Sequence, residues 1–301
     1  MKADDRRQIE RGMRAGDEDI YDENEIWMRW SGDKVDIGER LARVVRALAR
    51  GLSPGKKLRA LSIGSGSEPQ FRILEAFFRG GLYLLDIDRA ALDVVKQRIV
   101  RQRIAPVTLI RGDYTGLLLE PTRARDFFRA RLGSARLDLI TLHHSLYYCP
   151  ESAWGPLFGN LYRVLLGRRG AVHAVLMSSS CGDQDTTTWL YNRFAGKFFG
   201  ARNDQNLIRF GENTLRTSPA FARAAVRCRS DRVRFWVDDF GEFMAVVWMI
   251  LLYPEVHRYT PEQREEITEF IYRRFWKRRR PLVQVQDHLA VYRGFAGRDL
   301  L

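Results

Sequence analysis

The sequence has few cysteines and no long apolar run. Its three cysteines, Cys149, Cys181 and Cys228, are an odd number, lie far apart and form no Cys-x-x-Cys pair. This spacing argues against a disulfide framework and against a zinc site built on thiolates, and we expect no metal site. The longest apolar run, Phe243 to Tyr253, has 11 residues. Because a helix that crosses a bilayer needs about 20, the sequence predicts no membrane partner.

The N-terminal segment lacks the apolar stretch of a secretory signal, since it begins Met-Lys-Ala-Asp-Asp-Arg-Arg. We therefore expect a cytoplasmic protein. Of the 301 residues, 45% are hydrophobic and 29% are charged, which is typical of soluble globular proteins. This composition excludes an intrinsically disordered chain and is sufficient for a large core.

Lysine is also scarce. Of the 50 basic residues, seven are lysine and 43 are arginine, and the formal net charge is +13. A positive surface attracts phosphates and can serve nucleic-acid binding. The arginines are dispersed along the chain, however, and the one dense basic run is 277–280. Because nucleic-acid interfaces usually gather their charge on one face, a nucleic-acid partner is possible but not favoured. The oligomeric state stays open.

From residue 58 onward, short apolar runs alternate with amphipathic stretches. The predicted strands are 58–63, 82–87, 107–111, 137–142 and 171–177, and the predicted helices lie near 69–79, 89–103, 122–132 and 151–166. Five strand–helix alternations indicate a parallel sheet that is covered by helices on both faces. The sequence therefore predicts an α/β fold.

The chain is predicted to have three parts. Residues 1–57 form an N-terminal lid and a leading helix, which starts at Asp36 because Glu39 follows it as in a capping box. Residues 58–180 form the cofactor-binding core, and residues 181–301 complete the core and add a helical cap. After a polar loop at 181–188, we expect helices at 213–226, 239–253 and 261–279 and strands at 232–237 and 282–292.

The first predicted strand ends in a glycine turn, Leu-Ser-Ile-Gly-Ser-Gly-Ser-Glu-Pro over residues 61–69. Such a turn lets a ligand approach the backbone, and the helix that follows offers unpaired N–H groups. Asp86 comes 22 residues after Gly64, at the end of the second strand, where an acid can accept both hydroxyls of a ribose. A nicotinamide-binding turn would have a third glycine at Pro69. The pattern favours a nucleoside cofactor of another kind.

With Asp113 at the end of the third strand, this succession resembles the class I S-adenosylmethionine-dependent methyltransferases. The resemblance implies a Rossmann-like fold with a mostly parallel seven-stranded sheet, and S-adenosyl-L-methionine as cofactor. It implies that the glycine turn holds the methionine end, Asp86 the ribose and Asp113 the adenine. Ser62 and Glu68 depart from the family pattern, which has an acid and a third glycine there. The predicted cofactor-binding residues are Gly64, Ser65, Gly66, Glu68, Asp86, Ile87, Asp113, Tyr114 and His143.

Two stretches, 60–66 and 137–148, also resemble histamine N-methyltransferase and its relatives. The likeness extends to about residue 293 and implies methyl transfer to a nitrogen or oxygen of a small molecule, with amines favoured. It implies substrate contacts from Glu25 and from Gln286 or Asp287. The aromatic side chains of the N-terminal segment form either a lid over the site or part of a loose surface helix. The predicted substrate-binding residues are Glu25, Trp27, Trp30, Gln286 and Asp287.

His143 and His144 end the central fourth strand, where open α/β sheets bind their ligands. A neutral imidazole can accept a proton near pH 7, so we predict His144 and Tyr147 as catalytic residues. Either histidine could instead be structural, and Tyr148 is assigned to the core. Two other functions stay open: an RNA methyltransferase that uses the positive charge, and a cofactor-binding protein without methyl transfer activity.

Overall fold

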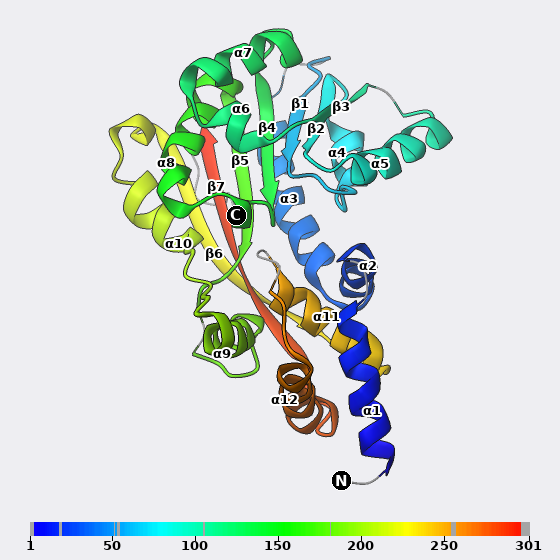
Figure 1. The fold of residues 1–301 in the computed structure, drawn as a ribbon. Coiled ribbons are helices and arrows are strands. Elements are labelled where there is room, and N and C mark those ends of the chain that lie inside the picture. The colour runs from blue at the N-terminus through cyan, green and yellow to red at the C-terminus, as the bar shows by residue number, and fades with distance from the viewer. Residues whose placement is uncertain are drawn as a thin grey trace. The chain divides into compact units, whose positions relative to one another are not determined.

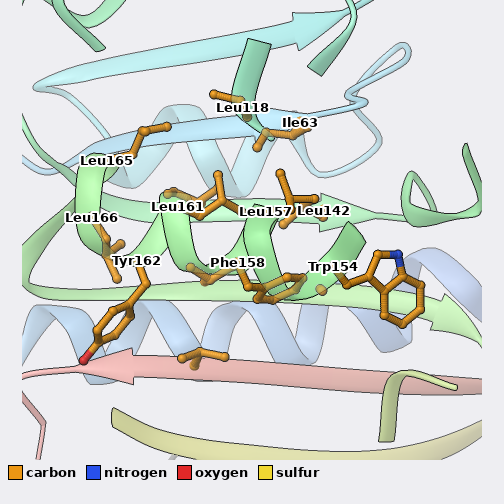
Figure 2. Close-up of a cluster of buried hydrophobic side chains, with 14 of the residues drawn as sticks. Ile63, Leu118, Leu142, Trp154, Leu157, Phe158, Leu161, Tyr162, Leu165 and Leu166 are labelled. Atoms are coloured by element: carbon orange, nitrogen blue, oxygen red, sulfur yellow. The ribbon is translucent and has the colours of Figure 1, made fainter. Parts of the chain in front are cut away.

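The computed structural model describes residues 3–17, 20–50, 52, 55–104, 106–180, 182–253 and 257–295. Within them, one seven-stranded sheet has the strand order β3-β2-β1-β4-β5-β7-β6 (Figure 1). The strands are β1 Arg59–Ile63, β2 Gly81–Asp86, β3 Val107–Arg111, β4 Leu137–His143, β5 Leu166–Met177, β6 Ala224–Phe235 and β7 Leu282–Arg293. Strands β1 to β5 pair in parallel, and β7 runs opposite to β4 and β5 (Figure 2). The prediction of a mostly parallel seven-stranded sheet is confirmed.

Helices fill the connections between the strands. They are α1 Ala3–Arg14, α2 Ile20–Trp30, α3 Asp33–Ala49, α4 Phe71–Phe77, α5 Arg89–Gln102, α6 Tyr114–Leu118, α7 Pro121–Leu132, α8 Glu151–Asn160, α9 Thr187–Phe199, α10 Leu207–Arg209, α11 Phe240–Leu252 and α12 Pro261–Ile271. The π-helical segments are η3 Leu161–Leu165, η4 Phe210–Leu215 and η6 Tyr272–Trp276, which continue α8, α10 and α12. The 3-10 turns are η1 Ala15–Asp17, η2 Leu146–Tyr148 and η5 Pro219–Phe221.

Two predictions about these elements were wrong, and two helices were not predicted. The leading helix begins at Asp33, so Asp36 lies inside α3 and its carboxylate accepts a hydrogen bond from Gln286 instead of capping. The predicted helix 213–226 is a π-helical segment and a 3-10 turn, and β6 already begins at Ala224. Sequence reasoning also missed α6 and α9, although Thr186 caps α9 by accepting a hydrogen bond from the Trp189 N–H.

Helices cover both faces of the sheet because strand residues alternate between two buried clusters. Leu61, Ile63 and Leu142 face a cluster with α6, α7 and α8, whereas Ala60 and Leu139 face a cluster with α3, α4 and α5. Figure 2 shows the first cluster, in which Trp154, Leu157, Phe158, Leu161, Tyr162 and Leu165 line one side of α8 and η3. Their spacing of three to four residues is that of a helix with one apolar face.

The chain packs as two compact units. The sheet unit comprises residues 37–176, 205–230 and 287–301, and the smaller unit comprises 1–36, 177–204 and 231–286. The smaller unit has its own aromatic core, in which the Phe235 ring contacts the rings of Trp27 on α2 and of Phe243 on α11. The division at 57/58 and 180/181 stays a prediction from the sequence.

The structure also bears on the cysteines and on membrane spans. Cys149 and Cys228 are free thiols, and Cys181 lies outside the described residues. Among the helices that the structure describes, none combines the length and the apolar character needed to cross a bilayer.

Candidate functional site

The glycine turn after β1 is built on two glycines with left-handed backbone, Gly64 with φ 63° and Gly66 with φ 49°. Their surroundings differ. A Cβ atom on Gly64 would lie 2.3 Å from the Cβ of Ser145, whereas nothing lies within 4 Å of a Cβ atom on Gly66. Gly64 is therefore required by close packing on the residues after β4. Gly66 leaves its backbone open to a ligand.

Asp86 at the end of β2 holds this turn in place. Its Oδ2 accepts a hydrogen bond of 2.7 Å from the Gly66 N–H, and its Oδ1 accepts one of 2.8 Å from the Asp88 N–H. Hydrogen bonds to a carboxylate are stronger than neutral ones, so they fix the position of both oxygens. Because each carboxylate oxygen can accept two hydrogen bonds, this half-buried side chain keeps acceptor capacity for a ligand.

Glu68 and Ser62, the two departures from the resembled pattern, contact each other. The Glu68 side chain is 2% exposed, Ser62 donates a hydrogen bond to it, and its Oε1 accepts a bond of 3.1 Å from the Gln70 N–H. Burial raises the pKa of Glu68 from 4.5 to about 7, against the opposing effect of these bonds and of Arg98. Glu68 also has a left-handed backbone, with φ 48°. The third position of the turn is therefore a buried acid.

Asp113 and Tyr114 have structural partners after β3. Asp113 is exposed and caps α6, since its Oδ1 accepts a bond of 2.9 Å from the Thr115 N–H. The Tyr114 hydroxyl donates a bond of 2.9 Å to the carbonyl of Ser145, and burial raises the pKa of this tyrosine. Tyr114 therefore supports the residue against which Gly64 packs.

Two large side chains beside Asp86 are unusually exposed. Ile87 is 66% exposed and Tyr148 is 59% exposed. Burial of its hydroxyl and the nearby charge of Asp86 both raise the pKa of Tyr148. The assignment of Tyr148 to the core was wrong, and its position just after the end of β4 was the signal that sequence reasoning missed. Exposed apolar surface beside an oriented carboxylate suits the base of a nucleoside.

His144 and Tyr147 contact each other at the end of β4. His144 has a left-handed backbone with φ 52°, and its N–H donates a bond of 2.9 Å to the Val175 carbonyl. Its Nδ1 lies 3.1 Å from the Tyr147 hydroxyl, and the two rings are nearly parallel at 8°. The backbone bond to β5 holds a half-buried imidazole in a fixed place.

His143 belongs to a row of histidines that the sequence reasoning did not anticipate. Its Nε2 lies 3.1 Å from Nδ1 of His173 on β5, and the ring of His173 stacks on that of His288 on β7. Burial, with smaller effects from His143 and His288, lowers the pKa of His173 well below its usual value. His173 is therefore neutral at physiological pH. No sequence pattern links these residues, because three different strands supply them.

The predicted substrate-binding residues lie in both units. In the smaller unit, Trp27 is 5% exposed and packs on Phe235, while Trp30 is 48% exposed. Glu25 is exposed and pairs with Arg29 at 3.0 Å. Gln286 is buried and donates a bond of 2.9 Å to Asp36.

Asp287, also buried, belongs to the sheet unit. It accepts a bond of 2.6 Å from Ser230. Within the sheet unit, the structure brings the predicted cofactor-binding residues and the pair His144–Tyr147 to one edge of the sheet. This is the carboxyl edge, where β1, β2, β3 and β4 end.

Comparison with known proteins finds relatives in structure only. No family model and no curated protein matches the sequence. The YcgJ protein of Bacillus subtilis is similar with a TM-score of 0.51 and 12% identity over 86% of this chain and 99% of that one.

Two further similar structures are methyltransferases. The plantazolicin methyltransferase BamL has a TM-score of 0.47 and 11% identity over 97% and 98% of the two chains. Phosphoethanolamine N-methyltransferase 2 of Haemonchus contortus has a TM-score of 0.45 and 13% identity, over 85% of this chain and 52% of that chain. At these identities the comparison concerns the fold, which is the Rossmann-like methyltransferase fold that the strand order shows.

Proposed function

We propose that this chain is an S-adenosylmethionine-dependent methyltransferase that acts on a nitrogen or oxygen of a small molecule, with amines favoured. One observation carries the proposal. Asp86, at the end of β2, holds the open glycine turn through Gly66 at the carboxyl edge of a mostly parallel sheet. Ligands of open α/β sheets bind at this edge, and a strand-two acid suits a ribose.

The residues present fit this cofactor. The backbone around Gly64 and Gly66 would hold its methionine end, Asp86 its ribose hydroxyls, and the exposed surfaces of Ile87 and Tyr148 its adenine. Asp113 is exposed beside them and would add a polar contact to the base. When bound, S-adenosylmethionine supplies an electrophilic methyl group on a sulfonium. The contribution of the protein is then mainly alignment of the acceptor with that methyl group.

His144 and Tyr147 are the proposed catalytic pair. An amine must be neutral to attack, so a base beside it assists by taking its proton. The His144 imidazole is held by its backbone bond to β5 and by its contact with the Tyr147 hydroxyl, so it would take the proton from the amine as an imidazolium and release it to solvent, which its half-buried ring reaches. The contacts of acceptors with Glu25, Trp27, Trp30, Gln286 and Asp287 remain part of the proposal.

Calorimetry with S-adenosylmethionine and S-adenosylhomocysteine tests the cofactor assignment. Asp86→Ala should weaken binding by about 1–3 kcal/mol, because it leaves buried polar groups unpaired. The matched control is Asp93→Ala, which removes an exposed carboxylate on α5 paired with Arg89. Unchanged affinity in Asp86→Ala, or tight binding of a nicotinamide dinucleotide by the native protein, would overturn the assignment.

A further inference from the structure

A pocket of about 620 Å³ lies at the opposite edge of the sheet unit. Residues of α7, of the turn before β4 and of η3 line it. Because β4 begins at Leu137 and β5 at Leu166, this is the amino edge of the sheet, and Figure 1 shows α7 at the end of the sheet where β4 begins. The pocket is thus separate from the candidate site at the carboxyl edge.

Of the described residues that line this pocket, four are arginines and none is an aspartate or glutamate. They are Arg125, Arg129, Arg136 and Arg163. Arg129 pairs with Asp126 at 2.6 Å. Within the described part of the chain, no carboxylate pairs with any of the other three arginines. A pocket with this lining has a positive potential that attracts anions.

The protein holds part of this cluster rigidly. Arg136 Nη1 donates to the carbonyls of Arg163, at 2.7 Å, and Val164, and its guanidinium lies over the Phe128 ring at 4.9 Å. Asn160, which also lines the pocket, is buried and donates to the carbonyls that end α6, so this wall is fixed. Guanidinium groups that are held in place lose less side-chain freedom when they bind an anion.

Apart from the pair of Arg129 with Asp126, the electrostatic surroundings of the pocket do not favour its positive charge. Burial, and then the positive charge of Arg293, lower the pKa of Arg136. Both effects disfavour the charged form of Arg136, and a bound anion would counteract them. Arginine forks match phosphoryl oxygens in geometry as well as in charge.

We propose that this pocket binds phosphoryl groups, either of a phosphorylated small molecule or of an RNA backbone. Its volume lies within the usual range for small-molecule sites, about 300–1,000 Å³. The site does not depend on the cofactor assignment, since its lining residues lie at the opposite edge of the sheet from the glycine turn and Asp86.

The test measures binding of inorganic pyrophosphate to the full chain by calorimetry at low salt. The double variant Arg125→Gln/Arg163→Gln should lower the affinity about tenfold or more, since it removes charged hydrogen-bond donors. The matched control Arg101→Gln/Arg131→Gln loses the same charge from exposed sites on α5 and α7 outside the pocket, and should keep native affinity within about twofold.

A second arm separates the two sources of phosphate. If a single-stranded RNA of about 20 nucleotides also loses affinity in the pocket variant and is displaced by pyrophosphate, the pocket takes an RNA backbone, and its binding should fall steeply with salt. If pyrophosphate binds but does not displace RNA, the pocket takes a phosphorylated small molecule. Equal losses in both double variants, or no saturable pyrophosphate binding by the native protein, would overturn the proposal. Thermal unfolding of each variant verifies that it is folded.

Discussion

At the carboxyl edge of the sheet, the polar groups are tied to the backbone, whereas at the amino edge the arginines of the pocket have few acidic partners. At the carboxyl edge, Asp86 accepts two backbone hydrogen bonds, and the turn that it holds depends on the close packing of Gly64 against Ser145. In the pocket, Arg125 and Arg163 project charge from exposed side chains. The two edges therefore differ in what defines the site: close packing of the backbone at the carboxyl edge, and exposed positive charge at the amino edge.

This contrast predicts different tolerances to substitution at the two edges. A site built from backbone shape should respond strongly to a single methyl group. A site built from long cationic side chains should respond to charge and to salt, and little to a methyl group nearby.

The largest effect is expected from Gly64→Ala. The new Cβ would collide with Ser145, and φ is positive, so the free energy of unfolding should fall by about 2–5 kcal/mol. The control is Gly133→Ala beside the arginine pocket, where φ is 60° and nothing lies within 4 Å of a Cβ atom. Gly133→Ala should lower the free energy of unfolding by only about 1–2 kcal/mol. Urea unfolding measures both, and equal losses would remove the distinction between the edges.

Next in size is the effect of His144 on methyl transfer. His144→Ala should lower the rate about 10²-fold while cofactor affinity stays within about threefold, which is the range for losing a positioned base. His144→Asn tests the same point with a residue that tolerates the left-handed backbone at this position. The rate is measured on an amine that the native protein accepts, and affinity by calorimetry.

Two other outcomes for His144→Ala would contradict the catalytic role. Loss of cofactor affinity together with activity would place His144 in the cofactor pocket. Unchanged activity with a lower melting temperature would make it a structural histidine. Tyr147→Phe should have a smaller effect on the rate, about tenfold, since it removes only one hydrogen bond to the imidazole.

Glu68 gives a pH-dependent effect. Its pKa is raised from 4.5 to about 7 in the folded protein, so the folded state keeps this proton where the unfolded chain has released it. The stabilising contribution is complete below the unfolded value and is lost as pH rises through about 7. Between pH 5 and 8, the native protein should lose about 1–3 kcal/mol relative to Glu68→Gln. Parallel stability curves for the two proteins would contradict this prediction.

The smallest effect is expected at Asp113. Asp113→Ala removes the cap of α6 and should cost about 1 kcal/mol of stability, whereas Asp113→Ser keeps a capping oxygen and should cost less. Calorimetry separates the two proposed roles of this residue. If Asp113 also contacts adenine, both variants bind S-adenosylmethionine more weakly than the native protein. If it is only a cap, both bind it normally.

Local patterns were sufficient for much of the fold. The alternation of apolar runs predicted β1 to β5 and, except for α6, the helices between them, because burial on both faces gives strands a distinctive composition. The same reasoning was wrong for 213–226. Leu215, Phe221 and Val226 enter one core, yet from a π-helical segment, a 3-10 turn and a strand. The presence of apolar residues in a short stretch does not distinguish these cases, because each kind of segment can bury the same side chains.

The sequence by itself determined the α/β class, the glycine turn and an acid at the end of the second strand, since these depend on residues close together in the chain. Only the tertiary structure decided that Glu68 lies buried against Ser62, that His143 contacts His173 and that four arginines line one pocket. The histidine contact and the arginine pocket join strands and helices that are distant in sequence, and the burial of Glu68 depends on how the turn packs. Their energies arise from burial and from charge at close range, which appear only when the sheet has assembled.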